Sequence, residues 1–156
     1  PVMLRWPGKL KPARYDTLVS SIDLAPTILA AAGLEGQPGM QGINLLEVIG
    51  DSGKSSREKI FGEIFEHDVC DIVNPVPGLL YRWCINGQWK LILPHRGSPI
   101  ITGKRKSSYR DPIWAAPQLF NLLKDPHEER DLAGAEAPRV TAMSSDIEGW
   151  WKVEKP

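Results

Sequence analysis

Residues 80–93 read Leu-Tyr-Arg-Trp-Cys-Ile-Asn-Gly-Gln-Trp-Lys-Leu-Ile-Leu, and this stretch decides how the second half of the chain folds. Two runs of β-forming residues flank Asn86-Gly87, the dipeptide that best accepts the positive φ values of a type I′ turn. The pattern predicts a β-hairpin in which Ile85 pairs with Gln88. One face of the hairpin should be mostly core, because side chains alternate along a strand. That face is formed by Leu80, Arg82, Cys84, Trp89, Leu91 and Leu93.

The segments on either side of the hairpin complete a small sheet. Residues 59–65 and 119–122 are short apolar runs typical of strands, and Asp125-Pro126 forces a turn after the second run. Residues 137–151 have helical periodicity. We expect an α+β arrangement, a small antiparallel sheet covered on one face by this C-terminal helix. The apolar stripe of the helix is formed by Val140, Met143, Ile147 and Trp150 or Trp151.

The first half of the chain is patterned differently. Residues 2–6 form a short β-type run that stops at Pro7-Gly8, and Asp23 can cap a helix over residues 24–32. One strand and one helix cannot cover each other's apolar faces, so we expect a strand-helix piece of a larger α/β domain. The chain alone should self-associate through this half or leave it poorly ordered. The polar segment 51–58 marks the boundary.

Composition narrows the class of protein. The chain has 156 residues, 42% of them hydrophobic and 24% charged, which is typical of a globular domain. Nineteen basic and nineteen acidic side chains cancel, so we expect neither nucleic acid nor a membrane as a partner. Because the chain opens at Pro1 without a methionine or a leader, we expect a piece of a longer protein. Cys70 and Cys84 are expected to be two partly buried free thiols.

Several motifs occur in the order and spacing of the sulfatase family, which the chain resembles over nearly its whole length. A strand-like run ends in Trp-Pro-Gly, an Asp-Leu-x-Pro-Thr helix follows, and the hairpin leads into a Trp-Lys-Leu-Ile strand. The late part has a Leu-Phe-Asn-Leu strand and an Asp-Pro-x-Glu turn. The residues that carry the resemblance are Trp6-Pro7-Gly8, Asp23-Leu24-Ala25-Pro26-Thr27, Gly42-Ile43-Asn44-Leu45, Glu63, Trp89-Lys90-Leu91-Ile92, Leu119-Phe120-Asn121-Leu122, Asp125-Pro126-His127-Glu128 and Asp131-Leu132-Ala133.

The resemblance implies the alkaline-phosphatase-like superfamily. Residues 1–56 would then be the end of the large α/β sulfatase domain, and residues 57–156 the small C-terminal subdomain. Sulfatases use a formylglycine, made from the first residue of Cys/Ser-x-Pro-x-Arg, and a calcium ion held by Asp and Asn or Gln side chains. Cys70 precedes Asp-Ile-Val and Cys84 precedes Ile-Asn-Gly, so neither lies in that motif. We therefore assign no catalytic residue and no metal ligand to this chain.

The resemblance also implies partners that this chain does not contain. The calcium ion and the formylglycine would belong to the N-terminal catalytic part of the parent enzyme, which we expect to be exported and to act on a sulfated carbohydrate. A phosphodiesterase or phosphonate hydrolase of the same superfamily is a second interpretation, because the nucleophile that separates the two lies elsewhere. A non-catalytic module that binds polyanions is a third.

Two polar clusters are candidate sites. The first follows strand 59–65 and could bind a divalent metal if its side chains converge, or could simply be a strand end with a solvated loop. It comprises Glu63, Glu66, His67, Asp68 and Asp71. Because the family's loop at this position often approaches the active-site cleft, the resemblance makes His67 and Asp68 the leading candidates for substrate contact.

The second cluster is basic and lies in the long segment 94–117. Its cations suit sulfate or carboxylate groups on a polyanionic sugar, and the alternative is a solvated charged loop. It comprises His95, Arg96, Lys104, Arg105, Lys106 and Arg110. His95, Arg96 and Lys104 are the substrate-contact candidates here. Arg82, which shares a face with leucines, should either extend its charge to solvent or pair with a buried acid such as Glu63.

Overall fold

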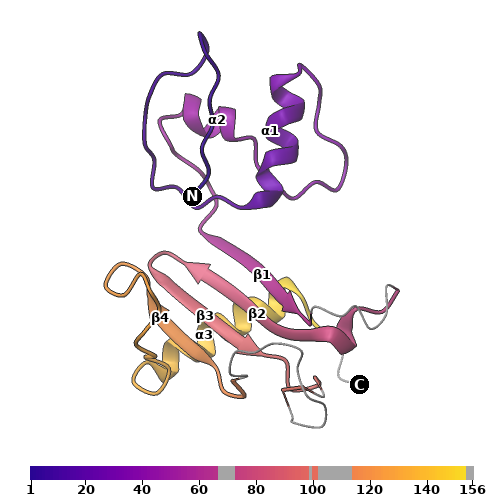
Figure 1. The fold of residues 1–156 in the computed structure, drawn as a ribbon, viewed down its shortest axis with the longest axis vertical. Helices are drawn as coiled ribbons and strands as arrows, with labels where there is room; N and C mark the ends of the chain where they lie inside the picture. Colours follow the sequence, from indigo (N-terminus) through magenta and orange to yellow (C-terminus); the bar gives the residue numbers. More distant parts are fainter. Residues whose placement is uncertain (67–72, 99, 102–113, 154–156) are drawn as a thin grey trace. The chain divides into compact units, whose positions relative to one another are not determined.

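A computed structural model describes residues 1–66, 73–98, 100–101 and 114–153 and divides the chain into two compact units, Pro1–Ile60 and Phe61–Pro156 (Figure 1). The first unit holds two short helices, and the second holds a sheet with one longer helix. The elements are a 3₁₀ turn Ser21–Asp23, α1 Leu24–Ala31, α2 Leu45–Gly50, β1 Lys59–Phe65, a 3₁₀ turn Val76–Gly78, β2 Leu79–Asn86, β3 Trp89–Pro94, β4 Gln118–Asn121 and α3 Ala137–Trp150.

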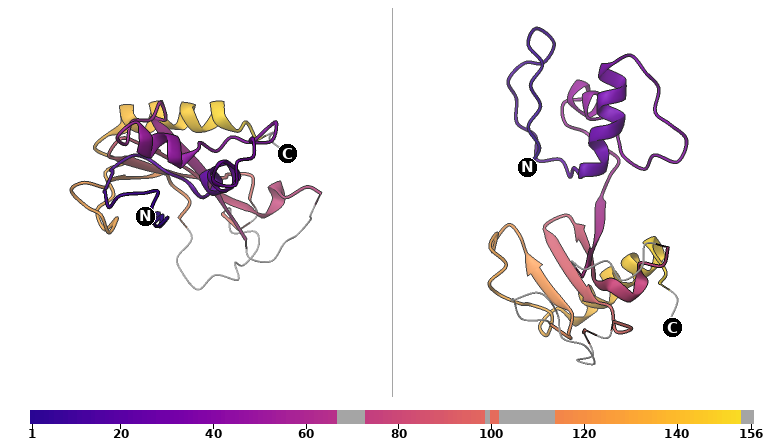
Figure 2. Two further views of the ribbon diagram at one scale, coloured as in Figure 1. Left: turned by 90° about the horizontal axis from the view of Figure 1, so that it is seen from above. Right: turned by 45° about the vertical axis from the view of Figure 1, so that its right-hand side comes forward.

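The second unit confirms the predicted α+β arrangement. Its four strands lie in the order β1-β2-β3-β4, and the β2–β3 and β3–β4 pairs are antiparallel. Helix α3 packs against β2 and β3 and covers one face of the sheet, as Figures 1 and 2 show. Between sheet and helix lies a core of Cys84, Leu91, Leu119, Met143 and Ile147. The predicted spans of β1 and α3 agree with the structure to within one residue.

The hairpin forms, but its predicted register is wrong by two residues. Asn86 pairs with Trp89 and Cys84 with Leu91, so the loop consists of Gly87 and Gln88. Only Gly87 has a positive φ there, 57°, which is the arrangement of a type II′ turn with glycine first. Because side chains repeat every two residues along a strand, this shift leaves the predicted core face on the same side.

Gly87 should therefore control the stability of the hairpin. A side chain at its position would meet nothing within 4 Å, so the cost of substitution comes from the left-handed backbone alone. We expect Gly87→Val to lower the free energy of unfolding by about 1–2 kcal/mol, and Gly87→Asn, which tolerates this conformation, to lower it clearly less. Urea unfolding of both variants measures the difference. Equal stabilities would contradict the turn geometry.

A second, smaller core lies beside the start of β2. Tyr81, Ile100 and Ile101 are buried together with Leu80, which the sequence had placed in the helix-covered core. Leu80 lies at the start of β2, where residues following β3 reach the sheet, and this long-range contact is absent from the local pattern. The Tyr81 hydroxyl accepts a hydrogen bond from the backbone N–H of Trp114.

The motif that follows β4 holds the sheet together. The Lys90 ammonium contacts both carboxylate oxygens of Glu128, at 2.7 and 2.8 Å. The Asp131 carboxylate accepts hydrogen bonds from the N–H groups of Leu119, at 3.0 Å, and Ala133, at 2.8 Å. Asp125 forms the expected turn, and backbone N–H groups, chiefly that of Arg130, lower the pKa of its carboxyl. These acidic residues therefore fasten the loop to β3 and β4.

Four tryptophans of the second unit make ring contacts within it. Trp150 stacks on Phe61 with ring centroids 5.2 Å apart, and Trp151 packs against Phe65. The Arg139 guanidinium lies 4.1 Å from the ring centroid of Trp89. Trp83 lies over Gly62, where an added Cβ would fall 2.3 Å from the indole ring. None of these four tryptophans is fully buried, and Trp150 is 37% exposed, so they pack at the margin of the core.

The first unit departs from prediction at its beginning. Residues 2–6 form no strand, because a strand needs a hydrogen-bonded neighbour and the described residues of this unit supply none. Helix α1 lies where expected, but a 3₁₀ turn precedes it and the Asp23 carboxylate does not cap it. No helix in the described residues is long and apolar enough to cross a membrane.

Candidate functional site

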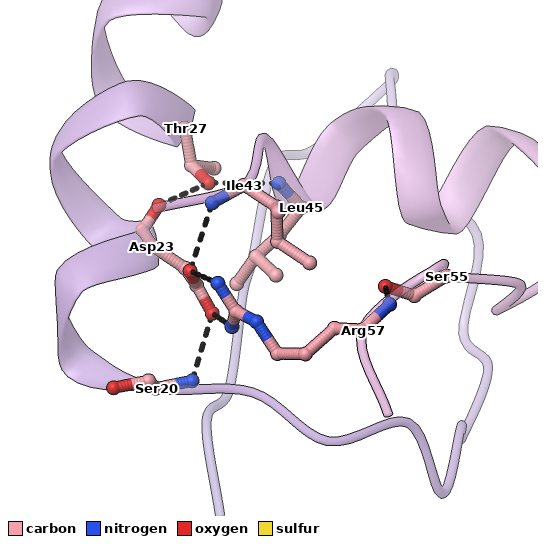
Figure 3. Close-up of polar contacts among 7 residues, drawn as sticks. All are labelled: Ser20, Asp23, Thr27, Ile43, Leu45, Ser55 and Arg57. Atoms are coloured by element: carbon pink, nitrogen blue, oxygen red, sulfur yellow. Dashed lines mark hydrogen bonds and ion pairs between the residues drawn. The ribbon is translucent and has the colours of Figure 1, made fainter. Parts of the chain in front are cut away.

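The most connected polar cluster of the first unit centres on Asp23 (Figure 3). Its carboxylate accepts two hydrogen bonds from the Arg57 guanidinium, through Nη1 to Oδ2 and through Nη2 to Oδ1, the latter at 2.7 Å. The N–H of Ser20 donates to Oδ2 at 2.7 Å and the N–H of Ile43 to Oδ1 at 2.9 Å. Four donors thus converge on one carboxylate that is 0% exposed.

Thr27 continues the same network one helical turn later. Its hydroxyl donates to the carbonyl of Asp23 at 2.6 Å and accepts from the N–H of Leu45 at 2.9 Å (Figure 3). Leu45 begins α2, so the Asp and Thr of the Asp-Leu-x-Pro-Thr motif tie α1 to the segment that leads into α2. The neighbouring Gly42 is needed for this approach, because a Cβ there would lie 2.1 Å from the carbonyl oxygen of Ile22.

Hydrogen bonding decides the ionisation state of Asp23. Burial on its own raises the pKa of this carboxyl, but the Arg57 guanidinium and the N–H groups of Ser20 and Ile43 outweigh burial and hold the pKa below its usual range. The carboxylate is therefore charged and fully used by its neighbours. We interpret this cluster as a structural clamp rather than a ligand site.

The second unit has a buried polar cluster on the helix-covered face of its sheet. Arg82, 4% exposed, pairs with Glu148 of α3 and donates to the carbonyl of Trp151, which follows the helix. Its Nε has no hydrogen-bond partner among the described residues. Of the two outcomes expected for Arg82, pairing with an acid is correct, but the acid is Glu148, whose side chain is 49% exposed, and not a buried acid such as Glu63.

His95 lies beside this ion pair. The backbone N–H of His95 donates to the carbonyl of Leu80 at 2.8 Å, which extends the β2–β3 register one step and puts His95 on the same face as Arg82. The side chain is 8% exposed. Burial is the main cause that lowers the pKa of His95, the positive charge of Arg82 lowers it further, and Glu148 opposes both. The imidazole is therefore neutral at pH 7.

The structure describes only part of the two candidate clusters. His67, Asp68 and Asp71 of the acidic cluster, and Lys104, Arg105, Lys106 and Arg110 of the basic cluster, lie outside the described residues. Arg96 is exposed in a turn directly after His95, and Glu66 is buried. Within residues 1–66, 73–98, 100–101 and 114–153, no three His, Cys, Asp or Glu side chains could hold a metal ion together. Cys84 is buried in the core, and Cys70 is not described.

The sequence alone did not reveal the ion-pair partners of two buried charged residues, Arg82 and Asp23. Arg82 among leucines signalled the need for an acid, but α3 supplies that acid only after it has docked on the sheet. Asp23 and Arg57 are separated along the chain by α1, α2 and the segments that join them, and the local pattern at Asp23 is that of an ordinary helix cap.

The chain is similar in sequence to proteins that are named as sulfatases. Human arylsulfatase A is 29% identical over 138 residues, 88% of this chain and 26% of its own length. An N-acetylgalactosamine-6-O-sulfatase of Bacteroides thetaiotaomicron is 26% identical over 151 residues, 95% of this chain and 26% of its own length. This chain thus spans about a quarter of the length of these relatives.

Two solved structures show the same fold. One, from Bacteroides thetaiotaomicron and described under the metabolism of multiple glycosaminoglycans, matches 94% of this chain and 28% of its own with a TM-score of 0.62 and 26% identity. The other, a phosphonate monoester hydrolase from Silicibacter pomeroyi, matches 86% of this chain and 25% of its own with a TM-score of 0.57 and 21% identity.

The sheet with its covering helix, the motif order and these similarities define the C-terminal portion of a sulfatase with an alkaline-phosphatase-like fold. More narrowly, the chain belongs to the family described as N-sulphoglucosamine sulphohydrolase, C-terminal, whose model matches residues 1–96. The match includes both the Asp23 clamp and the hairpin, so the resemblance seen in the sequence is confirmed.

Proposed function

We propose that this chain is part of an enzyme that hydrolyses sulfate esters of a sulfated carbohydrate. The observation that carries the proposal is the match of residues 1–96 to the C-terminal family of N-sulphoglucosamine sulphohydrolase. The similarity to an N-acetylgalactosamine-6-O-sulfatase supports the carbohydrate part of the proposal. We further propose that the parent enzyme is exported, where sulfated polysaccharides are available.

In this proposal the chain supports the fold and shapes the substrate cleft. The residues that carry out the hydrolysis belong to the N-terminal catalytic part of the parent. Neither Cys70 nor Cys84 lies in a Cys-x-Pro-x-Arg sequence, so this chain offers no residue for conversion to formylglycine. Formylglycine and calcium would be supplied by the N-terminal catalytic part. Of the five candidates, substrate contacts would come from His67, Asp68, Arg96 and Lys104, because His95 is buried and could act only through its neighbours.

The surface of the first unit supports such a partner. Helix α1 reads Leu-Ala-Pro-Thr-Ile-Leu-Ala-Ala and has no charged side chain, yet Ile28 is 65% exposed and Leu24 is 38% exposed. A helix that is apolar on every side normally lies inside a protein. We propose that the catalytic part of the parent covers this helix, and that the chain by itself covers it by self-association.

A phosphonate or phosphodiester hydrolase is the second candidate function. The similarity to the phosphonate monoester hydrolase favours it, although at 21% identity that similarity establishes the fold alone. The family match and the arylsulfatase relatives favour the sulfatase. Assays of the longer protein with an aryl sulfate and a phenylphosphonate ester separate the two, and faster turnover of the phosphonate ester would reverse the assignment.

The chain alone should be inactive. We expect purified residues 1–156 to show no turnover of an aryl sulfate above buffer, with or without calcium, because no nucleophile motif is present. The longer protein, produced with a formylglycine-generating enzyme, serves as the positive control. Calcium-dependent turnover by the pure chain would show that chemistry resides in these residues after all.

A further inference from the structure

The turn that follows β3 packs against the start of β2. The N–H of Ser98 donates to the carbonyl of His95 at 2.9 Å, closing a turn over residues 95–98. The Ser98 side chain is 0% exposed, and its hydroxyl oxygen accepts from the N–H of Ile100 at 3.3 Å. Ile100 and Ile101 are buried against Leu80 and Tyr81. This arrangement fixes the backbone on which exposed Arg96 is carried.

Within this turn, His95 is buried on the same face of the sheet as Arg82. It lies opposite Leu80, and Arg82 lies opposite Leu93, so His95 and Arg82 are diagonal neighbours beneath α3. Among the described residues, the charged groups that act on His95 are Arg82 from β2 and Glu148 from α3. The Glu148 carboxylate is already paired with Arg82, and its effect on the pKa of His95 is smaller than those of burial and of Arg82.

We infer that His95 is a positioning residue, which holds the turn over residues 95–98, and with it Arg96, on the sheet while its imidazole is neutral and releases the turn when it is protonated. Only one part of the inference rests on the proposed function, namely that Arg96 would face an anionic substrate. Protonation would place a second cation beside buried Arg82, which is unfavourable in an environment that excludes water. Acidification should therefore open this turn before it unfolds the sheet.

The direction of the pH effect follows from the pKa of His95, which burial lowers. Between the pKa of folded His95 and the ordinary value of about 6.5, the opened turn binds a proton and the closed turn does not. Closing is therefore most favourable above about pH 6.5 and weakens as the pH falls below it. One proton gives a change of up to about tenfold per pH unit.

Amide hydrogen exchange on the whole chain tests the inference. We expect the protection factors of the Ser98 and Ile100 amides to fall by up to about tenfold per pH unit below pH 6.5, while that of Leu132, bonded to the Leu119 carbonyl at 2.8 Å, stays constant. His95→Gln should remove this pH dependence. His127→Gln, which changes an exposed histidine of the same unit, should leave it intact.

The inference fails if Ser98 and Ile100 have constant protection between pH 5 and 8 in the unmodified chain, or if the pH dependence survives in His95→Gln. A parallel loss at Leu132 would also overturn it, since the whole sheet would then be opening. Because exchange requires no sulfate ester, these outcomes are independent of the proposed activity. If the longer protein shows no sulfatase turnover, the proposed function is contradicted, but the hydrogen-exchange result is unaffected.

Discussion

Replacing Asp23 by alanine is expected to lower the free energy of unfolding of the first unit by about 3–5 kcal/mol, the cost of removing one partner of a buried ion pair. The substitution leaves the Arg57 guanidinium and the N–H groups of Ser20 and Ile43 without their acceptor in a site that water does not reach. Fluorescence of Trp6, the single tryptophan of this unit, reports its unfolding in urea.

Asp16→Ala is the matched control, because it removes an aspartate that also pairs with an arginine in the same unit. The Arg14–Asp16 pair has side chains that are 92% and 93% exposed, so we expect a change of at most about 0.5 kcal/mol. The stability that Asp23 contributes should also be present above about pH 4 and be lost as the pH falls through its lowered pKa. Equal effects of the two substitutions would contradict the clamp.

Removing Glu148 is expected to cost more than removing its buried partner Arg82. Glu148→Ala leaves a guanidinium that is 4% exposed without a carboxylate, at a cost of about 3 kcal/mol. Arg82→Met leaves a carboxylate on a side chain that is 49% exposed, which water can solvate, and we expect a loss of about 1 kcal/mol or less. Urea unfolding, monitored through the fluorescence of the tryptophans of the second unit, measures both losses of stability.

The double variant and a control in the same helix sharpen this test. With Arg82→Met present, Glu148→Ala should cost little, because the buried charge is gone. Glu136→Ala breaks the Arg139–Glu136 pair, whose side chains are 40% and 39% exposed, and should cost no more than about 0.5 kcal/mol. If Arg82→Met lowers the free energy of unfolding more than Glu148→Ala does, the buried charge of Arg82 is not the main cost in this cluster.

The motifs that identify the family serve mainly to hold the fold together. Asp23 and Thr27 tie α1 to the start of α2, and Glu128 and Asp131 fasten the loop after β4 to its neighbouring strands. These residues hydrogen-bond the backbone or a partly buried cation, so their side chains are used by the fold. Their presence therefore indicates membership of the family and carries no direct information on the substrate.

Strand and helix periodicity predicted most elements of the second unit. β1, the two strands of the hairpin, the turn at Asp125 and helix α3 all depend on side chains within a few residues of one another. The core face of the hairpin was also predictable, because a two-residue error in register leaves it unchanged. The register itself was not, because Asn86-Gly87 and Gly87-Gln88 are both acceptable two-residue loops.

The sequence by itself determined the family, the α+β architecture of the second unit and the absence of a nucleophile motif, since each of these depends on residue types at short spacing. Only the tertiary structure decided that Arg57 meets Asp23, that Glu148 meets Arg82 and that His95 is buried beside that pair. Only the structure showed, likewise, that residues 2–6 form no strand. A buried ion pair or a strand needs a partner that is distant along the chain, and only the folded chain brings such a partner within reach.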